Sequence, residues 1–461
     1  MHYKRVARIS IIGIGVVIVL GSVFLDVIQT GAFGGFGYFQ AGGVILGLLA
    51  VTIGSVPGLT KRVLTAVVKN SPLILGSILI TLVLVEIVLR QFFYPVAVSS
   101  DYRRPDPVLG WRLEPNIHIT VQNIEFTIPL ETNSRGWRDV EHTFEKPPGT
   151  FRIVVLGDSF MEAYSVALED AFHRQLQALI SESQSTQVEV INLGVGGYGT
   201  LQEYLAFAEE GVRYQPDLVL LAFYTTNDVR DNSLQLESRY GQGIKVESRP
   251  FLLPGGPDDW EITIFDYEGT LQQYEAHRAE ESAQKPWYAW DNLAIARLIK
   301  EVQLRQARQS WTRSEASVDQ NLYAWIGVNR CQMADEYQQA WDITERVFVR
   351  LNREVQQAGA KLVVFDVPGM HEVDSDYIAQ VKALDPNHEY CLDTLPGNAY
   401  LNDLLSGMDV PLIDLVPAFR QEESQSVELF RSVDQHWNEA GHALAAQEVY
   451  RYLLEKHLLP Q

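Results

Sequence analysis

Residues 152–160 place the strongest constraint on what this chain can fold into. They read Arg-Ile-Val-Val-Leu-Gly-Asp-Ser-Phe, and this unbroken apolar run is typical of a strand buried on both faces of a parallel sheet. Gly157 ends the run, so we expect Ser159 just beyond the carboxyl end of the strand. Ligands bind at that edge of an open α/β sheet, where a turn into a helix presents backbone N–H groups. Gly-Asp-Ser is also ordinary turn chemistry, so the tripeptide alone does not identify a nucleophile.

The alternation of strand and helix continues after this segment. Residues 188–193 and 218–224 form further apolar runs, and segments with helical spacing separate the runs. This alternation predicts an α/β fold with a parallel, doubly wound sheet. An insertion rich in Trp and Tyr interrupts the pattern at about 229–335. The elements predicted after it are a helix at 336–358, strands at 361–367 and 411–415, and a final helix at 438–457.

The first 96 residues differ in composition from the rest. Apolar segments at 9–28, 38–56 and 72–89 are each long enough to cross a bilayer of about 30 Å at 1.5 Å per residue, so we expect three transmembrane helices. No Ala-x-Ala-like site follows the first segment, which favours an uncleaved anchor over a signal peptide. Basic residues precede the first segment and lie between the second and third, so both stretches are expected in the cytoplasm.

This topology places everything after about residue 92 on the extracytoplasmic side of a plasma or inner membrane. If the Gly-rich second segment did not cross the membrane, the residues after about 92 would lie on the cytoplasmic side instead. We therefore divide the chain into a membrane domain (1–96), a small β-rich lead-in (97–150) and an α/β domain (151–461) that contains the insertion. The alternating stretch 118–128 predicts a hairpin or a sheet edge in the lead-in.

Two regions rich in aromatic residues have more than one interpretation. Charged and aromatic residues of the lead-in could close over the active edge of the sheet or could pack on its surface. Those of the insertion could stack on sugar rings, cover an acyl chain, or pack the insertion onto the sheet. The sequence leaves these alternatives open.

Charge and cysteine content exclude several classes of function. The formal net charge is −21; residues 1–96 carry seven basic and two acidic residues, a net of +5, which leaves −26 for the remainder. Such an acidic remainder argues against a nucleic-acid partner. Cys331 and Cys391 are too few for a disulfide framework or a Cys-rich zinc site. One bridge between them outside the cytoplasm, or two unpaired buried thiols, would both fit. No metal or organic cofactor is indicated.

Four polar groups are expected at the same edge of the predicted sheet. Ser159 follows the first strand, the Gly-rich turn 192–200 follows the second, Asn227 follows the third, and Asp434-Gln-His436 precedes the last helix. Acyl transfer needs such a set: a nucleophile, a base, a group that orients the base, and donors for the oxyanion.

The Asp-x-His pair has its own alternatives. In an extended segment, residues two apart face the same way, so Asp434 could reach one ring nitrogen of His436 while the other faces Ser159. A capping acid beside a surface His would also explain the pair taken alone. A metal site with His442 lacks a third ligand at suitable spacing.

These blocks resemble those of the SGNH/GDSL hydrolase family. The resemblance covers roughly residues 150–457 and rests on Gly157-Asp-Ser-Phe160, the turn 192–200, Asn227-Asp228 and Asp434-Gln-His436, in this order. It implies a flavodoxin-like, three-layer αβα fold with Ser159 as nucleophile, His436 as base and Asp434 as the residue that orients it. The implied oxyanion donors are the backbone N–H groups of Ser159 and Gly197 and the side-chain amide of Asn227.

Two departures from the family pattern affect the expected reaction. The third block usually opens with Gly, and here Thr225 occupies that position, which we expect to narrow the pocket. The last block usually has Asp and His three residues apart, whereas here they are two apart. That spacing is similar to the branch containing the alginate O-acetylation proteins. Three preceding membrane spans are an addition to the usual soluble family member.

The sequence therefore predicts a membrane-anchored serine esterase that removes acyl, first of all acetyl, groups. Its partners would be an acylated small molecule or envelope polysaccharide, and the bilayer through three helices. A polysaccharide O-acetyltransferase uses the same serine and differs only in excluding water from the acyl-enzyme. A lipase or lysophospholipase would suit the proximity to lipid. A catalytically silent assembly module would suit the substitution at Thr225.

Overall fold

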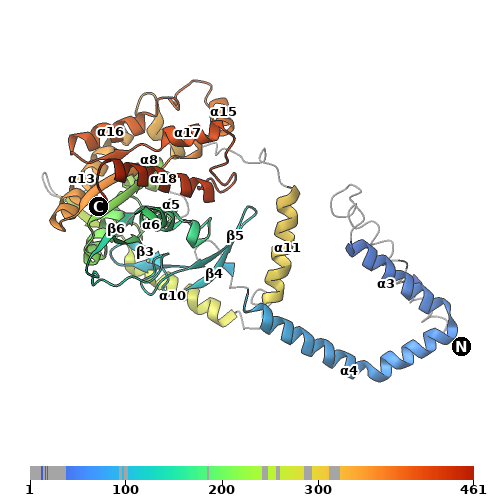
Figure 1. The fold of residues 1–461 in the computed structure, drawn as a ribbon. Helices are drawn as coiled ribbons and strands as arrows, with labels where there is room; N and C mark the ends of the chain where they lie inside the picture. The colour runs from blue at the N-terminus through green and yellow to red at the C-terminus, as the bar shows by residue number, and fades with distance from the viewer. Residues whose placement is uncertain are drawn as a thin grey trace. The chain divides into compact units, whose positions relative to one another are not determined.

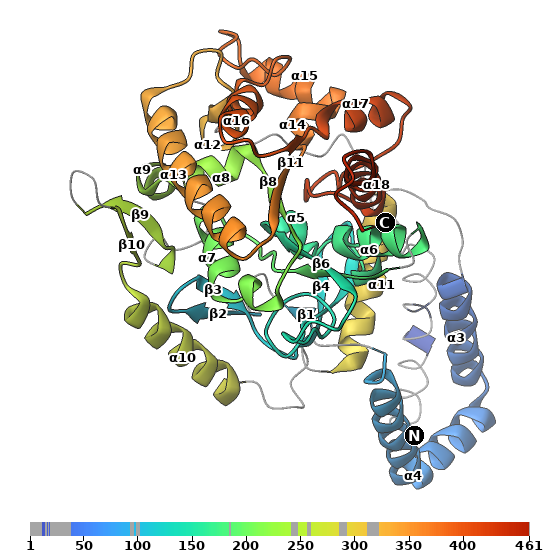
Figure 2. The same cartoon turned by 60° about the vertical axis from the view of Figure 1, so that its left-hand side comes forward.

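The structure is a computed structural model that describes residues 12–13, 16, 18, 38–92, 96–97, 102–183, 186–240, 248–255, 260–284, 293–310 and 322–460. Two compact units make up the chain, Met1–Leu89 and Arg90–Gln461 (Figures 1 and 2). Most of the first predicted span, 9–28, lies outside the described residues.

Within the described residues 38–92, the first unit contains two helices that meet at Val56. Helix α3 (Tyr38–Ser55) covers the second predicted span, and α4 (Pro57–Leu89) covers the third. The basic stretch expected between these spans is part of α4, which continues through Pro72. Within the described residues, Lys69–Leu89 is the segment long and apolar enough to cross a membrane. This finding provides weak support for a membrane segment, and three spans remain a prediction.

A five-stranded parallel sheet forms the centre of the second unit. Its order, β12-β11-β8-β6-β7, places the first strand in sequence between the second and the third, as in flavodoxin-like folds. The predicted α/β fold with a parallel sheet is confirmed. The order reverses between β6 and β8, and ligands bind at such a switch point. The strands are β6 (Thr150–Leu156), β7 (Gln187–Asn192), β8 (Leu218–Phe223), β11 (Lys361–Asp366) and β12 (Leu412–Ile413).

Helices cover both faces of this sheet, which explains the unbroken apolar runs in its strands. Val154 and Leu156 of β6 belong to the core that includes residues of α7 (Thr200–Glu209) and α13 (Asp335–Gln357). Ile153 and Val155 face the opposite core, which includes residues of α6 (Phe172–Ser183) and α18 (Glu439–Glu455). Figure 2 shows the two helix layers on opposite sides of the strands.

Shorter helices complete the second unit. Helix α6 begins at Phe172 and is preceded by a 3-10 turn, η1 (Leu168–Asp170). The other elements are α5 (Ser159–Glu162), η2 (Gly211–Tyr214), α8 (Thr225–Asp231), α9 (Leu234–Tyr240), β9 (Phe251–Pro254), β10 (Trp260–Thr263), α10 (Tyr267–Gln284), α11 (Ala294–Ser310), α12 (Leu322–Ile326), η6 (Gly327–Asn329), α14 (Met370–Val373), α15 (Ser375–Leu384), α16 (Pro396–Gly407) and α17 (Val416–Ser424).

The lead-in forms two β hairpins. One pairs β2 (Arg103–Asp106) with β3 (Gly110–Leu113), and the other pairs β4 (His118–Gln122) with β5 (Thr127–Glu131). A short strand, β1 (Val96–Ala97), runs parallel to β4. Buried lead-in side chains, including Trp111, Leu130 and Trp137, join the same core as α7 and α13. The lead-in therefore shares the core of the second unit.

A disulfide joins Cys331 to Cys391, with their Cα atoms 4.9 Å apart. The bond ties the end of the insertion to the loop that precedes α16. Backbone hydrogen bonds accompany it, from Cys331 N–H to Glu389 O (2.8 Å) and from Cys391 N–H to Asn329 O (2.9 Å). The sequence left this pairing open, because one bridge outside the cytoplasm and two unpaired buried thiols both fitted it.

Candidate active site

Ser159 is the first residue of α5, directly after β6. Asp158 caps the helix, since its Oδ1 accepts a hydrogen bond from the Phe160 N–H (2.9 Å). A Cβ at Gly157 would overlap the Met161 side chain, so the turn out of the strand depends on glycine at that position. The tight turn holds the Ser159 hydroxyl at the switch point between β6 and β8.

His436 and Asp434 lie next to this hydroxyl. His436 Nε2 is 2.7 Å from Ser159 Oγ, and His436 Nδ1 is 2.8 Å from Asp434 Oδ1. We had expected the segment that carries them to be extended, and this expectation was wrong. Gln435 has a φ of +67°, and Arg431 N–H donates to His436 O while Gln435 N–H donates to Arg431 O, both at 2.8 Å. A tight turn therefore creates the Asp–His contact.

His436 and Asp434 each stabilise the charged form of the other. Burial by itself lowers the pKa of His436, but the charge and hydrogen bond of Asp434 outweigh it and raise that pKa above the usual value. Burial raises the pKa of Asp434, but His436 and a hydrogen bond from Tyr164 lower it overall. An ionised Asp434 accepts from Nδ1–H, so Nε2 is the nitrogen left to accept a proton from Ser159.

Tyr164 is a further member of this network. Its hydroxyl donates to Asp434 Oδ2 (2.9 Å) and lies 3.2 Å from His436 Nδ1. The residue follows α5 after Ala163, whose φ of +56° turns the chain back. Sequence reasoning missed it, because nothing in a helix-ending tyrosine indicates a contact with a carboxylate 270 residues later.

The Gly-rich turn after β7 presents a backbone donor beside Ser159. Gly197 has a φ of +78°, a region that favours glycine. Neither the Ser159 N–H nor the Gly197 N–H has a hydrogen-bond acceptor among the described residues. The neighbouring Gly196 is held on both sides: its N–H donates to Glu162 Oε2 (2.6 Å), and its carbonyl accepts from Trp111 Nε1 (3.2 Å).

Asn227 reaches the site from the first turn of α8. Its Nδ2 donates to Asp158 Oδ2 at 2.7 Å, which leaves a second Nδ2 hydrogen for another acceptor. Thr225, which we had expected to narrow the pocket, is buried, and its Cγ2 lies 2.8 Å from where a Cβ on Gly397 would be. The Thr225 methyl group therefore packs against the start of α16.

The lead-in also contributes to the site. Glu125, in the turn between β4 and β5, accepts hydrogen bonds from the backbone N–H groups of Val433 (2.9 Å) and Asp434 (2.7 Å). The ring of Phe126 packs edge-on against Tyr164, with centroids 6.0 Å apart. Of the two roles open for the lead-in, these contacts favour the one at the active edge.

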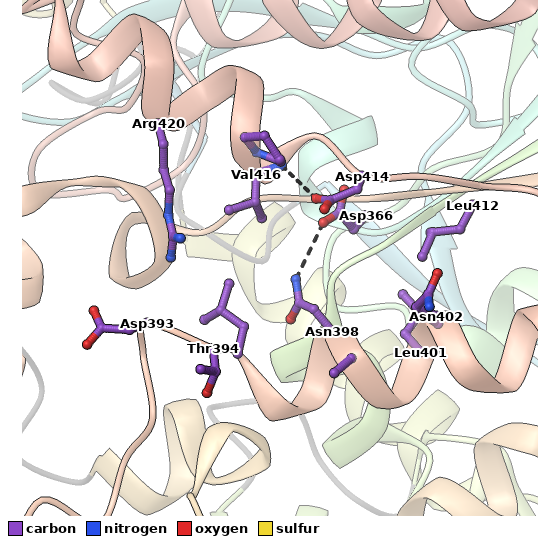
Figure 3. Close-up of a pocket in the computed structure, with 13 residues that line it drawn as sticks. Asp366, Asp393, Thr394, Asn398, Leu401, Asn402, Leu412, Asp414, Val416 and Arg420 are labelled. Carbon is purple, nitrogen blue, oxygen red and sulfur yellow. Dashed lines mark hydrogen bonds between the residues drawn. The ribbon is translucent and has the colours of Figure 1, made fainter.

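A cavity of about 510 Å³ lies at the carboxyl ends of β11 and β12, between α16 and α17 (Figure 3). Asp366 accepts from Leu415 N–H (2.6 Å) and Asn398 Nδ2 (3.4 Å) there. Burial, and then the Asp414 carboxylate, raise the pKa of Asp366 well above the usual value. This cavity contains none of the predicted site residues, so it is separate from the serine site.

Possible metal ligands are sparse in the described part of the chain. There, no three His, Cys, Asp or Glu side chains lie close enough to hold a metal ion together. His442 is buried with its ring 5.5 Å from that of Trp437, and burial lowers its pKa well below the usual value.

Comparison with known proteins gives one family match. The model of the GDSL-like Lipase/Acylhydrolase family matches residues 155–444, more than half of the chain. No curated relative matches the chain. Similar solved structures include the acetyl xylan esterase AlAXEase (13% identity, TM-score 0.34, covering 66% of this chain and 100% of that one), a lipase/acylhydrolase from Enterococcus faecalis (14%, 0.32, 66% and 96%) and a two-domain esterase active on acetylated mannans (9%, 0.32, 67% and 49%).

Proposed function

The chain belongs to the GDSL-like lipase/acylhydrolase family and is a hydrolase of ester bonds, and from this premise we propose that Ser159, His436 and Asp434 are its catalytic triad. One observation carries the assignment: His436 Nε2 lies 2.7 Å from Ser159 Oγ while its Nδ1 contacts Asp434. A nucleophile, a base and an orienting carboxylate in hydrogen-bond contact are the arrangement that acyl transfer requires.

The proposed reaction has two halves. Ser159 Oγ attacks the ester carbonyl as its proton passes to His436 Nε2, and the alcohol then leaves with that proton. The acyl group stays on Ser159 until water, losing a proton to His436, attacks the acyl carbon; the acid then leaves as His436 returns that proton to Ser159 Oγ. Asp434 stabilises the imidazolium formed in each half.

We assign the oxyanion hole to the N–H groups of Ser159 and Gly197 and to the Asn227 amide. The two backbone donors have no other acceptor among the described residues. Asp158 accepts one Nδ2 hydrogen of Asn227 and so orients the amide, which leaves the other hydrogen for the oxyanion. Donors fixed before the reaction stabilise developing charge without reorganisation.

We also propose that the catalytic domain is anchored to a membrane and faces the extracytoplasmic side. In this proposal residues 1–96 hold three spans, residues 97–150 are the lead-in, and residues 151–461, with the insertion at 229–335, are catalytic. The apolar helix Lys69–Leu89 supports an anchor. The Cys331–Cys391 bond supports an oxidising compartment, where disulfides persist.

An acetyl ester of an envelope glycan is the substrate we propose. The Asp-x-His spacing supports it, because that spacing resembles the alginate O-acetylation branch. Incubation with an acetylated glycan should release acetate. Transfer of the acetyl group to an acceptor glycan without release of acetate would contradict hydrolysis and identify an O-acetyltransferase.

The assignment of the nucleophile is tested with 4-nitrophenyl acetate and the full chain in detergent. We expect Ser159→Ala to abolish nitrophenol release and a phosphonate inhibitor to form an adduct on Ser159. Ser183→Ala, at the exposed end of α6, should match the wild type. Equal rates for Ser159→Ala and the wild type would reject Ser159 as nucleophile.

Topology needs a separate test. A reporter fused after residue 96 should be active only outside the cytoplasm. Cytoplasmic activity of that reporter would overturn the three-span arrangement and leave the triad assignment untouched.

A further inference from the structure

Arg103, at the start of β2 in the lead-in, reaches the serine site. A Cβ built on Gly196 would lie 2.5 Å from Arg103 Nη2 and 3.5 Å from Ser159 Cβ. The separation between Nη2 and Ser159 Cβ therefore cannot exceed 6.0 Å. A guanidinium this close to the nucleophile can contact the substrate beside its ester group.

The Arg103 guanidinium makes no hydrogen bond to a residue that the structure describes. Its Nε is buried without a hydrogen-bond partner among the described residues, and its closest charged neighbour, Glu162 Oε2, is 3.7 Å from Nη2. Glu162 already accepts from the Tyr102 hydroxyl (3.0 Å) and the Gly196 N–H (2.6 Å). The Arg103 side chain keeps 23% of its surface exposed, so its outer nitrogens remain open to a ligand.

The charge of Arg103 is also incompletely balanced. The fully buried Glu162 lies near a second guanidinium, that of Arg138, which donates to the carbonyl groups of Glu162 (2.9 Å) and Val166 (2.7 Å). One carboxylate thus faces two cations. The site carboxylates Asp158 and Asp434 already have partners, because Asp158 accepts from the Asn227 amide and Asp434 is paired with His436. Among the described residues, Arg103 therefore shares its ion-pair partner, Glu162, with Arg138.

We propose that Arg103 is a specificity-determining residue that binds a carboxylate or phosphate group of the substrate next to the ester being cleaved. The inference rests on the proposed function, because it places the ester carbon on Ser159. A guanidinium presents paired N–H donors that match either anion. The anion can belong to the acyl part, as in a half-ester of a dicarboxylic acid, or to the alcohol part, as in an acidic sugar.

The experiment compares matched esters with the full chain in detergent. One arm sets 4-nitrophenyl hemisuccinate against 4-nitrophenyl acetate, and the other sets O-acetylated glucuronic acid against O-acetylated glucose. In at least one arm we expect the wild type to have the higher kcat/KM for the anionic ester. The arm that shows the preference locates the anion in the acyl or the alcohol part.

Arg103→Met should remove this preference. Loss of a charged hydrogen-bonded contact predicts a fall of roughly 10- to 100-fold in kcat/KM for the anionic ester, mainly through KM, with the neutral ester changed less than about twofold. Arg103→Lys should restore part of the preference. Arg104→Met is the matched control, because adjacent strand residues point to opposite faces, and it should keep the preference.

Salt provides a test that needs no variant. KM of the wild type for the anionic ester should rise with ionic strength while KM for the neutral ester stays constant. An equal fall on all four esters in Arg103→Met would overturn the inference and assign Arg103 to the oxyanion or the fold. A wild type without an anionic preference in either arm would also overturn it. A wild type that cleaves none of the esters overturns the proposed function, and this inference with it.

Discussion

The carboxyl edge of the parallel sheet and the lead-in contribute to one site in different ways. The edge carries the proposed reactive groups, because Ser159 follows β6 and Asn227 follows β8. The lead-in contributes contacts that hold the loops in place: Glu125 binds the backbone of the Asp434 loop, and Trp111 binds the carbonyl of Gly196. The sheet topology therefore brings the polar side chains at the strand ends close together. The lead-in, an earlier part of the chain, holds the loops that set the distances between them.

The largest effect should come from the reactive groups at the edge. We expect His436→Ala to lower kcat by roughly 10⁴- to 10⁶-fold, nearly as much as Ser159→Ala, because members of a triad act as one unit. The double variant should lose little more than either single variant. Steady-state rates with 4-nitrophenyl acetate measure this. A mild defect in His436→Ala would mean that another group is the base.

A smaller effect is expected from an edge group that only stabilises charge. Asn227→Ala should lower kcat by about 100- to 1000-fold with little change in KM, since one oxyanion donor is lost. Asn352→Ala, on the solvent side of α13, serves as the matched control and should be close to wild type. A change confined to KM would place Asn227 in substrate binding instead.

The lead-in should have a weaker influence on rate, and Glu125 tests it. Glu125→Ala frees the Val433 and Asp434 N–H groups, so we expect kcat to fall by up to about 100-fold as the loop loses its position. Because Asp434 raises the pKa of His436, a looser pair should also move the acid limb of the pH–rate profile to lower pH.

Two variants make this prediction specific to the contact. Glu125→Gln keeps one acceptor oxygen and should recover part of the rate. Glu131→Ala, in the same hairpin but paired at the surface with His118, should leave the profile unchanged. An unshifted acid limb in Glu125→Ala would show that Glu125 supports only the fold.

A buried group beneath the edge should affect stability more than rate. Glu203 in α7 is 1% exposed, and neither carboxylate oxygen has a hydrogen-bond partner among the described residues. Burial, followed by the charges of Asp158 and Asp231, raises its pKa well above the usual 4.5. Its contribution to stability is therefore complete below pH 4.5 and is lost as pH rises through the folded-state value.

Glu203→Gln removes that ionisation. We expect the free energy of unfolding to rise by about 1–3 kcal/mol at pH 8, because each unit by which folding raises the pKa destabilises the fold by about 1.4 kcal/mol above that pKa, and we expect no gain at pH 4. Urea unfolding at both pH values measures the difference. Glu209→Gln, on the exposed side of the same helix, should change nothing, and a gain of equal size at both pH values would contradict the ionisation argument.

The amino-acid sequence was enough to predict the fold class and most of the proposed reactive groups. Buried strands of a parallel sheet have unbroken runs of apolar residues, so residues 153–156 and 218–223 could be recognised as strands from such runs. Once the strands are recognised, the polar residues that directly follow them can be placed at the carboxyl edge of the sheet. These signals are local, and the predicted contact of Ser159, Asp434 and His436 is present in the structure.

The contacts that hold the loops of the site in place, and the pairing of the two cysteines, could be found only in the tertiary structure. Glu125 and Val433 are 308 residues apart, and Arg103 reaches Gly196 across the fold. The positive φ of Gln435, which creates the Asp–His contact, occurs at a residue with no glycine to signal it. Such contacts leave no periodic pattern, because side-chain packing between distant segments selects them and short-range backbone preference does not.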